Sequence, residues 1–179
     1  MKAIIGRRMR WTMEWKVALA HEDQAEALYR MMQAAGRKMA EQGFGQWDEH
    51  YPTLALVRQD IQEKLLFVVM EDAQVLACFT LSTQGIPQYE QVNWLAPNAR
   101  YCVVHRLCVR PDQQGKGIGH RAMAFVEQVA RQRGFEAIRL EAFGENRASL
   151  RVYEGSGYSA RGEIEAWGMP FICYEKKIV

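Results

Sequence analysis

The feature that most constrains this chain is a cluster of three glycines between a strand-like run and a helix-like run. The cluster lies in RPDQQGKGIGHRAM, at Gly115, Gly117 and Gly119. Before it, the mostly apolar RYCVVHRLCVR (100–110) predicts a buried strand. After it, HRAMAFVEQVARQRG (120–134) has apolar residues at helical spacing and predicts a helix. The chain must therefore contain a strand–loop–helix unit whose loop backbone is unusually bare.

This glycine loop is suited to binding phosphate groups. Glycine reaches positive φ and, without a Cβ, lets another molecule approach the main chain closely. The N–H groups of residues 115–120 at a helix start are free, the helix dipole adds positive potential, and Lys116 adds a full charge. These properties predict a pyrophosphate-binding loop.

Three other interpretations of the glycine loop are a Walker loop, a dinucleotide-binding loop and a loop without a ligand. The Walker pattern G-x-x-x-x-G-K-[ST] does not occur in the sequence. Residues 117–122 satisfy the dinucleotide pattern G-x-G-x-x-A, and Glu141 follows 22 residues after Gly119. Against that pattern, only 60 residues remain after Gly119, too few for a full doubly wound sheet. A loop with a purely structural role stays open as an alternative.

The rest of the chain predicts alternating strands and helices around this unit. We expect an α/β fold with a largely antiparallel sheet and one parallel crossover. We take 13–179 as a single domain and 1–12 as an N-terminal extension. The expected strands are 13–20, 137–143, 158–164 and 171–178, with a hairpin in 65–83, and the expected helices are 21–43, 53–64 and 146–155.

Composition argues against several classes of protein. The net charge is +2 and the basic residues are spread along the chain, so no nucleic-acid partner is indicated. No apolar run reaches about 18 residues, so no membrane span is expected. The cysteines lie in apolar, strand-like runs without a CxxC pair. They predict reduced, buried thiols in a cytoplasmic protein rather than a disulfide frame or a metal site.

A second motif follows in NRASLRVYEGSGY (146–158). Asn146, Ser149 and Tyr153 stand three and four residues apart, so they share one face of a helix. Alone, the segment also fits a capped helix with a half-buried tyrosine. Because the segment follows the glycine loop, a functional motif becomes the favoured interpretation over a purely structural helix.

With both motifs, the chain resembles the GNAT superfamily of N-acetyltransferases. That family's acetyl-CoA signature, Q/R-x-x-G-x-G/A after a strand, is present from Gln114 to Gly119. Its later motif has an Asn, a Tyr seven residues on, and then Gly-Phe or Gly-Tyr, here Asn146, Tyr153 and Gly157-Tyr158. The match spans about residues 101–158.

The resemblance implies a GNAT fold with a mixed, mostly antiparallel sheet of about six to seven strands and about four helices. It implies transfer of an acetyl group from acetyl-CoA directly to a primary amine, on a small molecule rather than a protein, by a monomer or a homodimer without a metal. The residues that it places at acetyl-CoA are Leu107, Cys108, Val109, Gln114, Gly115, Lys116, Gly117, Ile118, Gly119, His120, Asn146, Ser149 and Tyr153.

The chemistry assigns roles to a few of these residues. Tyr153 is the candidate general acid that protonates the leaving thiolate. The acceptor amine must lose a proton, and the candidate bases are His105 and Glu141. A core histidine and an ion-paired glutamate remain open as alternatives for these two residues. Cys108 lacks an evident activating His–carboxylate pair, so an acetyl-enzyme is disfavoured.

Two points stay open at this level. A GNAT-like module that binds acyl-CoA without catalysis is the rival to an enzyme. The sequence does not identify the acceptor amine, although we expect the acceptor pocket to involve the first half of the chain. Aromatic candidates for that pocket are Trp47, Tyr51, Tyr89 and Trp94.

Overall fold

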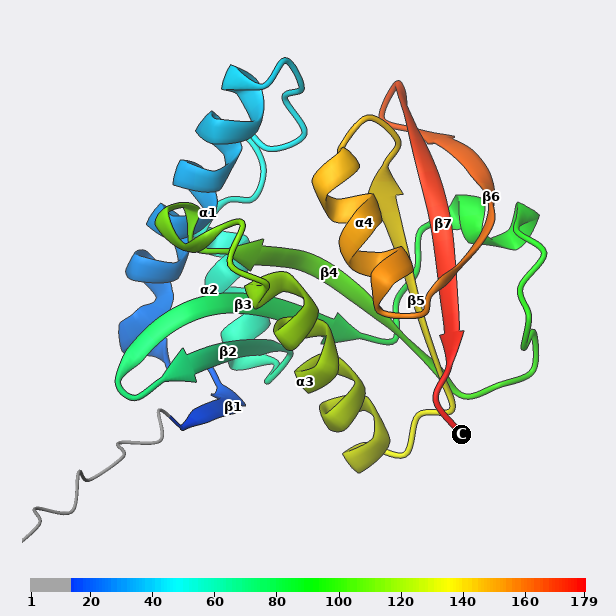
Figure 1. The fold of residues 1–179 in the computed structure, drawn as a ribbon, viewed down its shortest axis with the longest axis horizontal. Coiled ribbons are helices and arrows are strands. Elements are labelled where there is room, and N and C mark those ends of the chain that lie inside the picture. Colours follow the sequence, from blue (N-terminus) through cyan, green and yellow to red (C-terminus); the bar gives the residue numbers. More distant parts are fainter. Residues whose placement is uncertain (1–13) are drawn as a thin grey trace, which may run out of the picture.

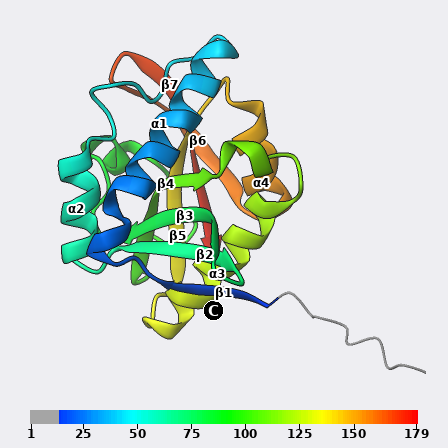
Figure 2. The same ribbon diagram turned by 90° about the vertical axis from the view of Figure 1, so that its left-hand side faces the viewer.

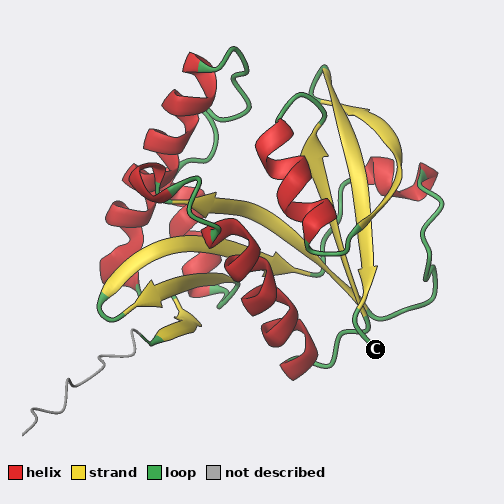
Figure 3. Ribbon diagram, viewed as in Figure 1, coloured by secondary structure: helices red, strands yellow, loops and turns green. Residues whose placement is uncertain are grey.

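The predicted alternation of strands and helices builds one seven-stranded sheet with helices on both of its faces (Figures 1 and 3). The computed structural model describes residues 14–179, so the expected extension 1–12 lies outside the described residues. The strands are β1 (Trp15–Leu19), β2 (Leu66–Glu71), β3 (Gln74–Ser82), β4 (Tyr101–Val109), β5 (Ala137–Phe143), β6 (Ser159–Ala166) and β7 (Met169–Lys177). Their order across the sheet is β1-β2-β3-β4-β5-β7-β6.

The described helices agree with the sequence pattern and add short 3₁₀ turns. The α-helices are α1 (Ala25–Glu41), α2 (Leu54–Gln62), α3 (Ile118–Gln132) and α4 (Arg147–Gly155). The 3₁₀ turns are η1 (Glu22–Gln24), η2 (Pro87–Gln91) and η3 (Pro111–Gln113), and the sequence analysis did not anticipate them. No helix in residues 14–179 has the length and apolarity that crossing a bilayer requires.

Local signals explain where the helices begin and end. The Thr53 side chain accepts a hydrogen bond from Leu56 N–H at 3.2 Å and caps α2. Asn146 caps α4 in the same way, through Ser149 N–H at 3.2 Å. Helix α3 begins two residues earlier than predicted, because Gly117 at φ 78° takes the N-cap position.

The sheet topology confirms the predicted single crossover. Every neighbouring pair of strands is antiparallel except β4 and β5, which are parallel and joined through α3. A parallel pair requires such a crossover connection, since a tight turn can only reverse the chain.

Alternation along the strands places two apolar layers on opposite faces of the sheet. Leu66, Val68 and Cys78 pack in a cluster with residues of α1 and α2. Phe67 and Phe79, from the same two strands, stack at 5.3 Å between ring centroids and pack in a cluster with residues of α3. Figure 2 shows α1 and α2 on one side of this part of the sheet and α3 on the other.

The sheet opens where β4 and β5 separate, and this opening positions the site. The two strands pair only at Tyr101–Val103, and Figure 1 shows them diverging beyond that point. An extra residue in β4 bends the strand there, because Thr80 pairs with His105 whereas Cys78 pairs with Cys108. Arg106, within this bulge, has a positive φ of 51°.

Candidate active site

A cavity of about 850 Å³ fills the opening between β4 and β5, flanked by α1, α3 and α4. It brings together residues that lie far apart in the sequence. The predicted site residues that line it are His105, Leu107, Cys108, Val109, Gln114, Gly115, Gly117, Ile118, Gly119, His120, Glu141, Asn146, Ser149 and Tyr153. Lys116 does not line it, and its Nζ donates to Gln113 Oε1 at 2.9 Å.

The glycine loop presents a bare backbone to this cavity. Gly115 and Gly117 have φ values of 81° and 78°, and a Cβ on either would meet nothing within 4 Å. Within residues 14–179, none of the main-chain N–H groups of 114–120 donates a hydrogen bond to another protein group. The start of α3 is therefore an open set of donors with the geometry that a phosphate group needs.

Gly119 serves a different purpose from the other two glycines. It lies inside α3, and a Cβ there would come within 3.0 Å of Val152 Cγ2 in α4. We conclude that this glycine permits close packing of α3 on α4. The sequence analysis treated all three glycines as parts of the loop.

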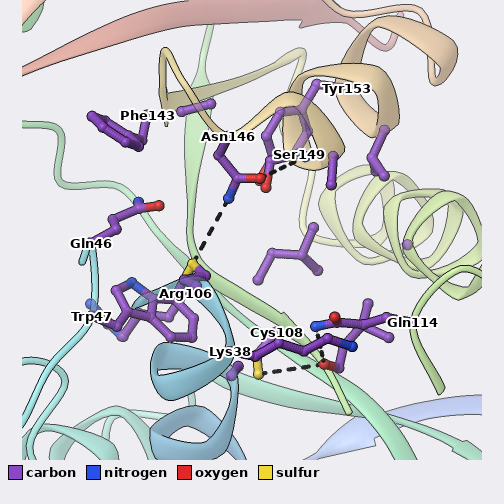
Figure 4. A pocket seen from close by; sticks show the side chains of 18 of the residues that line it. Lys38, Gln46, Trp47, Arg106, Cys108, Gln114, Phe143, Asn146, Ser149 and Tyr153 are labelled. Atoms are coloured by element: carbon purple, nitrogen blue, oxygen red, sulfur yellow. Dashed lines mark hydrogen bonds between the residues drawn. The ribbon is translucent and has the colours of Figure 1, made fainter. Parts of the chain in front are cut away.

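The α4 side of the cavity presents a phenol and a carboxamide (Figure 4). The Tyr153 hydroxyl makes no hydrogen bond with the protein within the described part of the chain, and burial raises the pKa of this phenol. The phenol is therefore protonated at neutral pH and free to donate. Asn146 Oδ1 caps α4, and its Nδ2 donates to Met39 Sδ at 3.9 Å.

The β4 side of the cavity presents a strand edge without a neighbour. Leu107, Cys108 and Val109 follow the point at which β4 leaves β5, so their edge faces the opening. The Cys108 thiol contacts the carbonyl oxygens of Met31 and Val109, both at 3.9 Å. It has no histidine or carboxylate contact among residues 14–179, in keeping with its interpretation as an inert thiol.

His105 and Glu141 meet where the two strands separate. Their Nδ1 and Oε1 atoms are 3.9 Å apart, and their side chains are 17% and 11% exposed. His105 Nε2 lies 3.0 Å from the Gln84 carbonyl oxygen and 3.1 Å from Ser82 Oγ. Burial lowers the pKa of His105 and raises the pKa of Glu141. The sequence named the two as alternative bases, and the structure places them side by side.

Sequence reasoning missed Arg106, which also lines the cavity. Its Nε and Nη2 donate to Asp60 Oδ2 at 3.0 and 2.5 Å, and its Nη1 donates to the Tyr51 hydroxyl at 3.1 Å. Asp60 also accepts a hydrogen bond from Thr80 Oγ1 at 2.9 Å. Asp60 lies 46 residues before Arg106, so no local pattern signals the pair.

The aromatic candidates divide into two groups. Trp47 and Tyr51 line the cavity as expected. Tyr89 and Trp94 do not, because they pack edge to face with each other in a separate buried cluster. Tyr89 nevertheless reaches the site, since its hydroxyl donates to Glu141 Oε2. Other aromatic and apolar residues that line the cavity, which the sequence analysis did not name, include Phe143, Trp167, Met169 and Phe171.

Comparisons with known proteins agree with this geometry. The model of the family described as Acetyltransferase (GNAT) family matches residues 25–158. An L-methionine sulfoximine/L-methionine sulfone acetyltransferase of Salmonella typhimurium (strain LT2) is 29% identical over 72 residues. That alignment covers 40% of this chain and only 42% of the relative's length.

Solved structures extend the likeness to nearly the whole chain. An acetyltransferase of the GNAT family from Streptococcus agalactiae has a TM-score of 0.80 at 21% identity, covering 91% of this chain and 95% of that chain. The PaiA N-acetyltransferase from Thermoplasma acidophilum, solved in complex with coenzyme A, has a TM-score of 0.68 at 17% identity, covering 92% and 99%. These likenesses, both under 25% identity, concern the fold.

Proposed function

This chain belongs to the GNAT family of acetyltransferases, and we propose that it moves an acetyl group from acetyl-CoA directly to a primary amine of a small molecule. One observation carries the proposal. A single cavity joins the open N–H groups at the start of α3 to the carboxylate of Glu141 and the imidazole of His105. A donor held by its diphosphate at one end can thus meet an amine at the other.

The glycine loop and the strand edge fit the acyl donor. The free N–H groups of residues 115–120 bind the diphosphate of acetyl-CoA, aided by the dipole of α3. The unpaired edge of Leu107–Val109 offers main-chain groups to the pantetheine arm. One of its N–H groups polarises the thioester carbonyl as charge develops on that oxygen. Lys116 adds only long-range attraction, since its ammonium is outside the cavity.

Tyr153 acts as the general acid in this proposal. The neutral amine attacks the thioester carbon and forms a C–N bond, and the C–S bond then breaks. The thiolate takes the proton of the Tyr153 hydroxyl, and the nitrogen of the new amide loses its surplus proton to restore that hydroxyl. Cys108 takes no covalent part, so the transfer is direct.

The acceptor end of the cavity favours an amine with an apolar body. The guanidinium of Arg106 is already matched by Asp60 at 2.5 Å. Two carboxylates line the cavity, and of these Asp48 is exposed whereas Glu141 is only 11% exposed and lies 3.9 Å from His105. Aromatic side chains of Trp47 and Phe143 supply apolar walls (Figure 4). The relative named for L-methionine sulfoximine and L-methionine sulfone supports a small-molecule acceptor.

Two measurements test this function. Titration calorimetry with acetyl-CoA tests the donor site, and we expect saturable binding that coenzyme A competes for. Release of free thiol from acetyl-CoA is then followed against a panel of primary amines, including amino acids, alkylamines and arylalkylamines. Binding without amine-dependent thiol release from any of them would favour the rival, a non-catalytic acyl-CoA-binding module.

A further inference from the structure

We infer that His105 Nδ1 and Glu141 Oε1 together form a seat for the ammonium group of the acceptor, in which His105 Nδ1 removes the proton. The inference rests on the proposed function and assigns separate tasks to two residues that the sequence offered as alternatives. It also gives Ser82, Gln84 and Tyr89 the task of positioning them.

The neighbours of His105 fix which ring nitrogen carries the proton. Nε2 lies 3.0 Å from the carbonyl oxygen of Gln84, which can only accept a hydrogen bond. The Ser82 hydroxyl, 3.1 Å from Nε2, already accepts from Gln84 N–H and donates to the Gln84 carbonyl. Nε2 must therefore be the donor, and the lone pair of the neutral ring is on Nδ1.

Nδ1 keeps this lone pair available to the cavity. It makes no hydrogen bond with any residue of 14–179, and its distance of 3.9 Å to Glu141 Oε1 is too long for one. Among residues 14–179, the Tyr158 hydroxyl is the one side-chain nitrogen or oxygen that is both fully buried and without a hydrogen-bond partner. Since His105 Nδ1 also lacks a partner, it is not fully buried. His105 lines the cavity, and its side chain is 17% exposed.

The spacing of the two acceptor atoms suits one ammonium nitrogen. A nitrogen placed 2.8 Å from each of two atoms 3.9 Å apart sees them at an angle of about 88°. Two N–H bonds of a tetrahedral ammonium can reach both atoms with modest bending. A quaternary ammonium, which has no N–H, cannot.

Tyr89 holds the carboxylate in place for this task. Its hydroxyl donates to Glu141 Oε2, which leaves Oε1 facing His105. Tyr89 is itself fixed by packing against Trp94, with ring centroids 4.9 Å apart. The bound ammonium thus meets an oriented carboxylate rather than a mobile one.

The proton transfer balances as follows. The ammonium gives one proton to Nδ1, and the resulting imidazolium is stabilised by Glu141. The neutral amine keeps an N–H bond to Glu141 and rotates about its C–N bond, so that its lone pair faces the thioester. Its second proton leaves after attack by the route through Tyr153 described above. His105 returns its proton to water when the product leaves.

Nuclear magnetic resonance on protein labelled with ¹⁵N-histidine tests the seat directly. The chain has four histidines, and the His105 signals are those lost in His105→Gln. We expect long-range ¹H–¹⁵N correlations typical of the Nε2–H tautomer. An Nδ1–H tautomer would overturn the inference, because the lone pair would then face Gln84.

Two cations of equal charge probe the seat without any knowledge of the true acceptor. n-Butylammonium has three N–H donors, and butyltrimethylammonium has the same alkyl chain but none. We expect n-butylammonium to shift the Nδ1 resonance of His105 and butyltrimethylammonium to leave it in place. Absence of a shift with n-butylammonium, or an equal shift with both cations, contradicts the seat.

Matched variants separate the two tasks. Glu141→Gln keeps the shape but not the charge, and we expect it to abolish the n-butylammonium shift. If the shift persists unchanged, Glu141 has no part in the seat. Calorimetry with acetyl-CoA on the same samples distinguishes this failure from failure of the proposed function, since the donor site is at the other end of the cavity.

A kinetic split gives a further readout once the panel has supplied an acceptor. We expect Glu141→Gln to raise the acceptor KM about 10-fold or more, because it weakens binding of the cation. We expect His105→Gln to lower kcat about 10²-fold, because it removes the base while its amide can still donate to the Gln84 carbonyl. Effects of both variants on KM alone would contradict a proton-accepting His105.

Discussion

Replacement of Tyr153 by Phe separates catalysis from folding at this site. The Tyr153 hydroxyl has no hydrogen-bond partner in the described part of the chain, so its removal leaves no other polar group without a partner. We therefore expect the free energy of unfolding to change by less than about 0.5 kcal/mol. Turnover at neutral pH should fall about 10²-fold, equivalent to about 2.7 kcal/mol of transition-state stabilisation.

The pH dependence of this loss is a second signature. Because a thiol has a pKa of about 8.5, the thiolate needs less help as the pH rises through that value, and the deficit should shrink. The assay is thiol release at saturating acetyl-CoA and amine, with single-turnover rates to show that chemistry is limiting. Acetyl-CoA affinity, measured by calorimetry, should stay within about threefold of the unmodified protein.

Tyr158→Phe is the matched control. The rings of Tyr153 and Tyr158 are 6.4 Å apart, but the Tyr158 hydroxyl is buried, has no hydrogen-bond partner within residues 14–179, and does not line the cavity. Its removal should leave turnover unchanged and stabilise the fold by up to about 1 kcal/mol. An unchanged turnover in Tyr153→Phe, or equal losses in both variants, would refute the role of Tyr153.

Three further predictions concern packing, charge and pH. Gly119→Ala should cost about 1 kcal/mol in urea denaturation because its Cβ meets Val152 at 3.0 Å, and the cost should vanish in a Val152→Ala background. Asp60→Asn should cost about 3 kcal/mol by the same method because it leaves the buried Arg106 charge uncompensated, and a loss below about 1 kcal/mol would contradict that. Burial lowers the pKa of His105 from 6.5, so the imidazole stays neutral at that pH and kcat/KM should fall only at lower pH. If kcat/KM instead fell with acidification above pH 6.5, and this fall disappeared in His105→Gln, the pKa of His105 would be raised rather than lowered.

Much of the fold was legible from the sequence because its signals are local. Apolar periodicity predicted the strand at 137–143 with the bounds that β5 has. Asn146 marked the start of α4 as a side-chain cap, and the helix predicted over 53–64 corresponds to α2. The spacing of the glycines predicted the bare loop before α3, and two of them have the positive φ that this loop requires.

The site was only partly legible, because its geometry depends on which strands become neighbours. The phosphate-binding role of the loop was predicted from its glycines and the start of a helix, and the role of Tyr153 through a family resemblance; both stay predictions. His105 and Glu141 were named separately, and no local pattern shows that they meet at 3.9 Å. The Arg106–Asp60 pair and the Tyr89–Glu141 hydrogen bond were missed, since each joins residues more than 40 positions apart.

The sequence by itself determined the order of strands and helices, the parallel crossover and the exposed amides at the start of α3. These features follow from hydrogen bonding and side-chain spacing within a few residues, so they do not depend on the tertiary structure. Only the tertiary structure decided that β4 bulges at Arg106 and leaves β5 after three paired residues. That separation arises from the register of the whole sheet, and it opens the cavity that Tyr153, His105, Glu141 and the glycine loop line together.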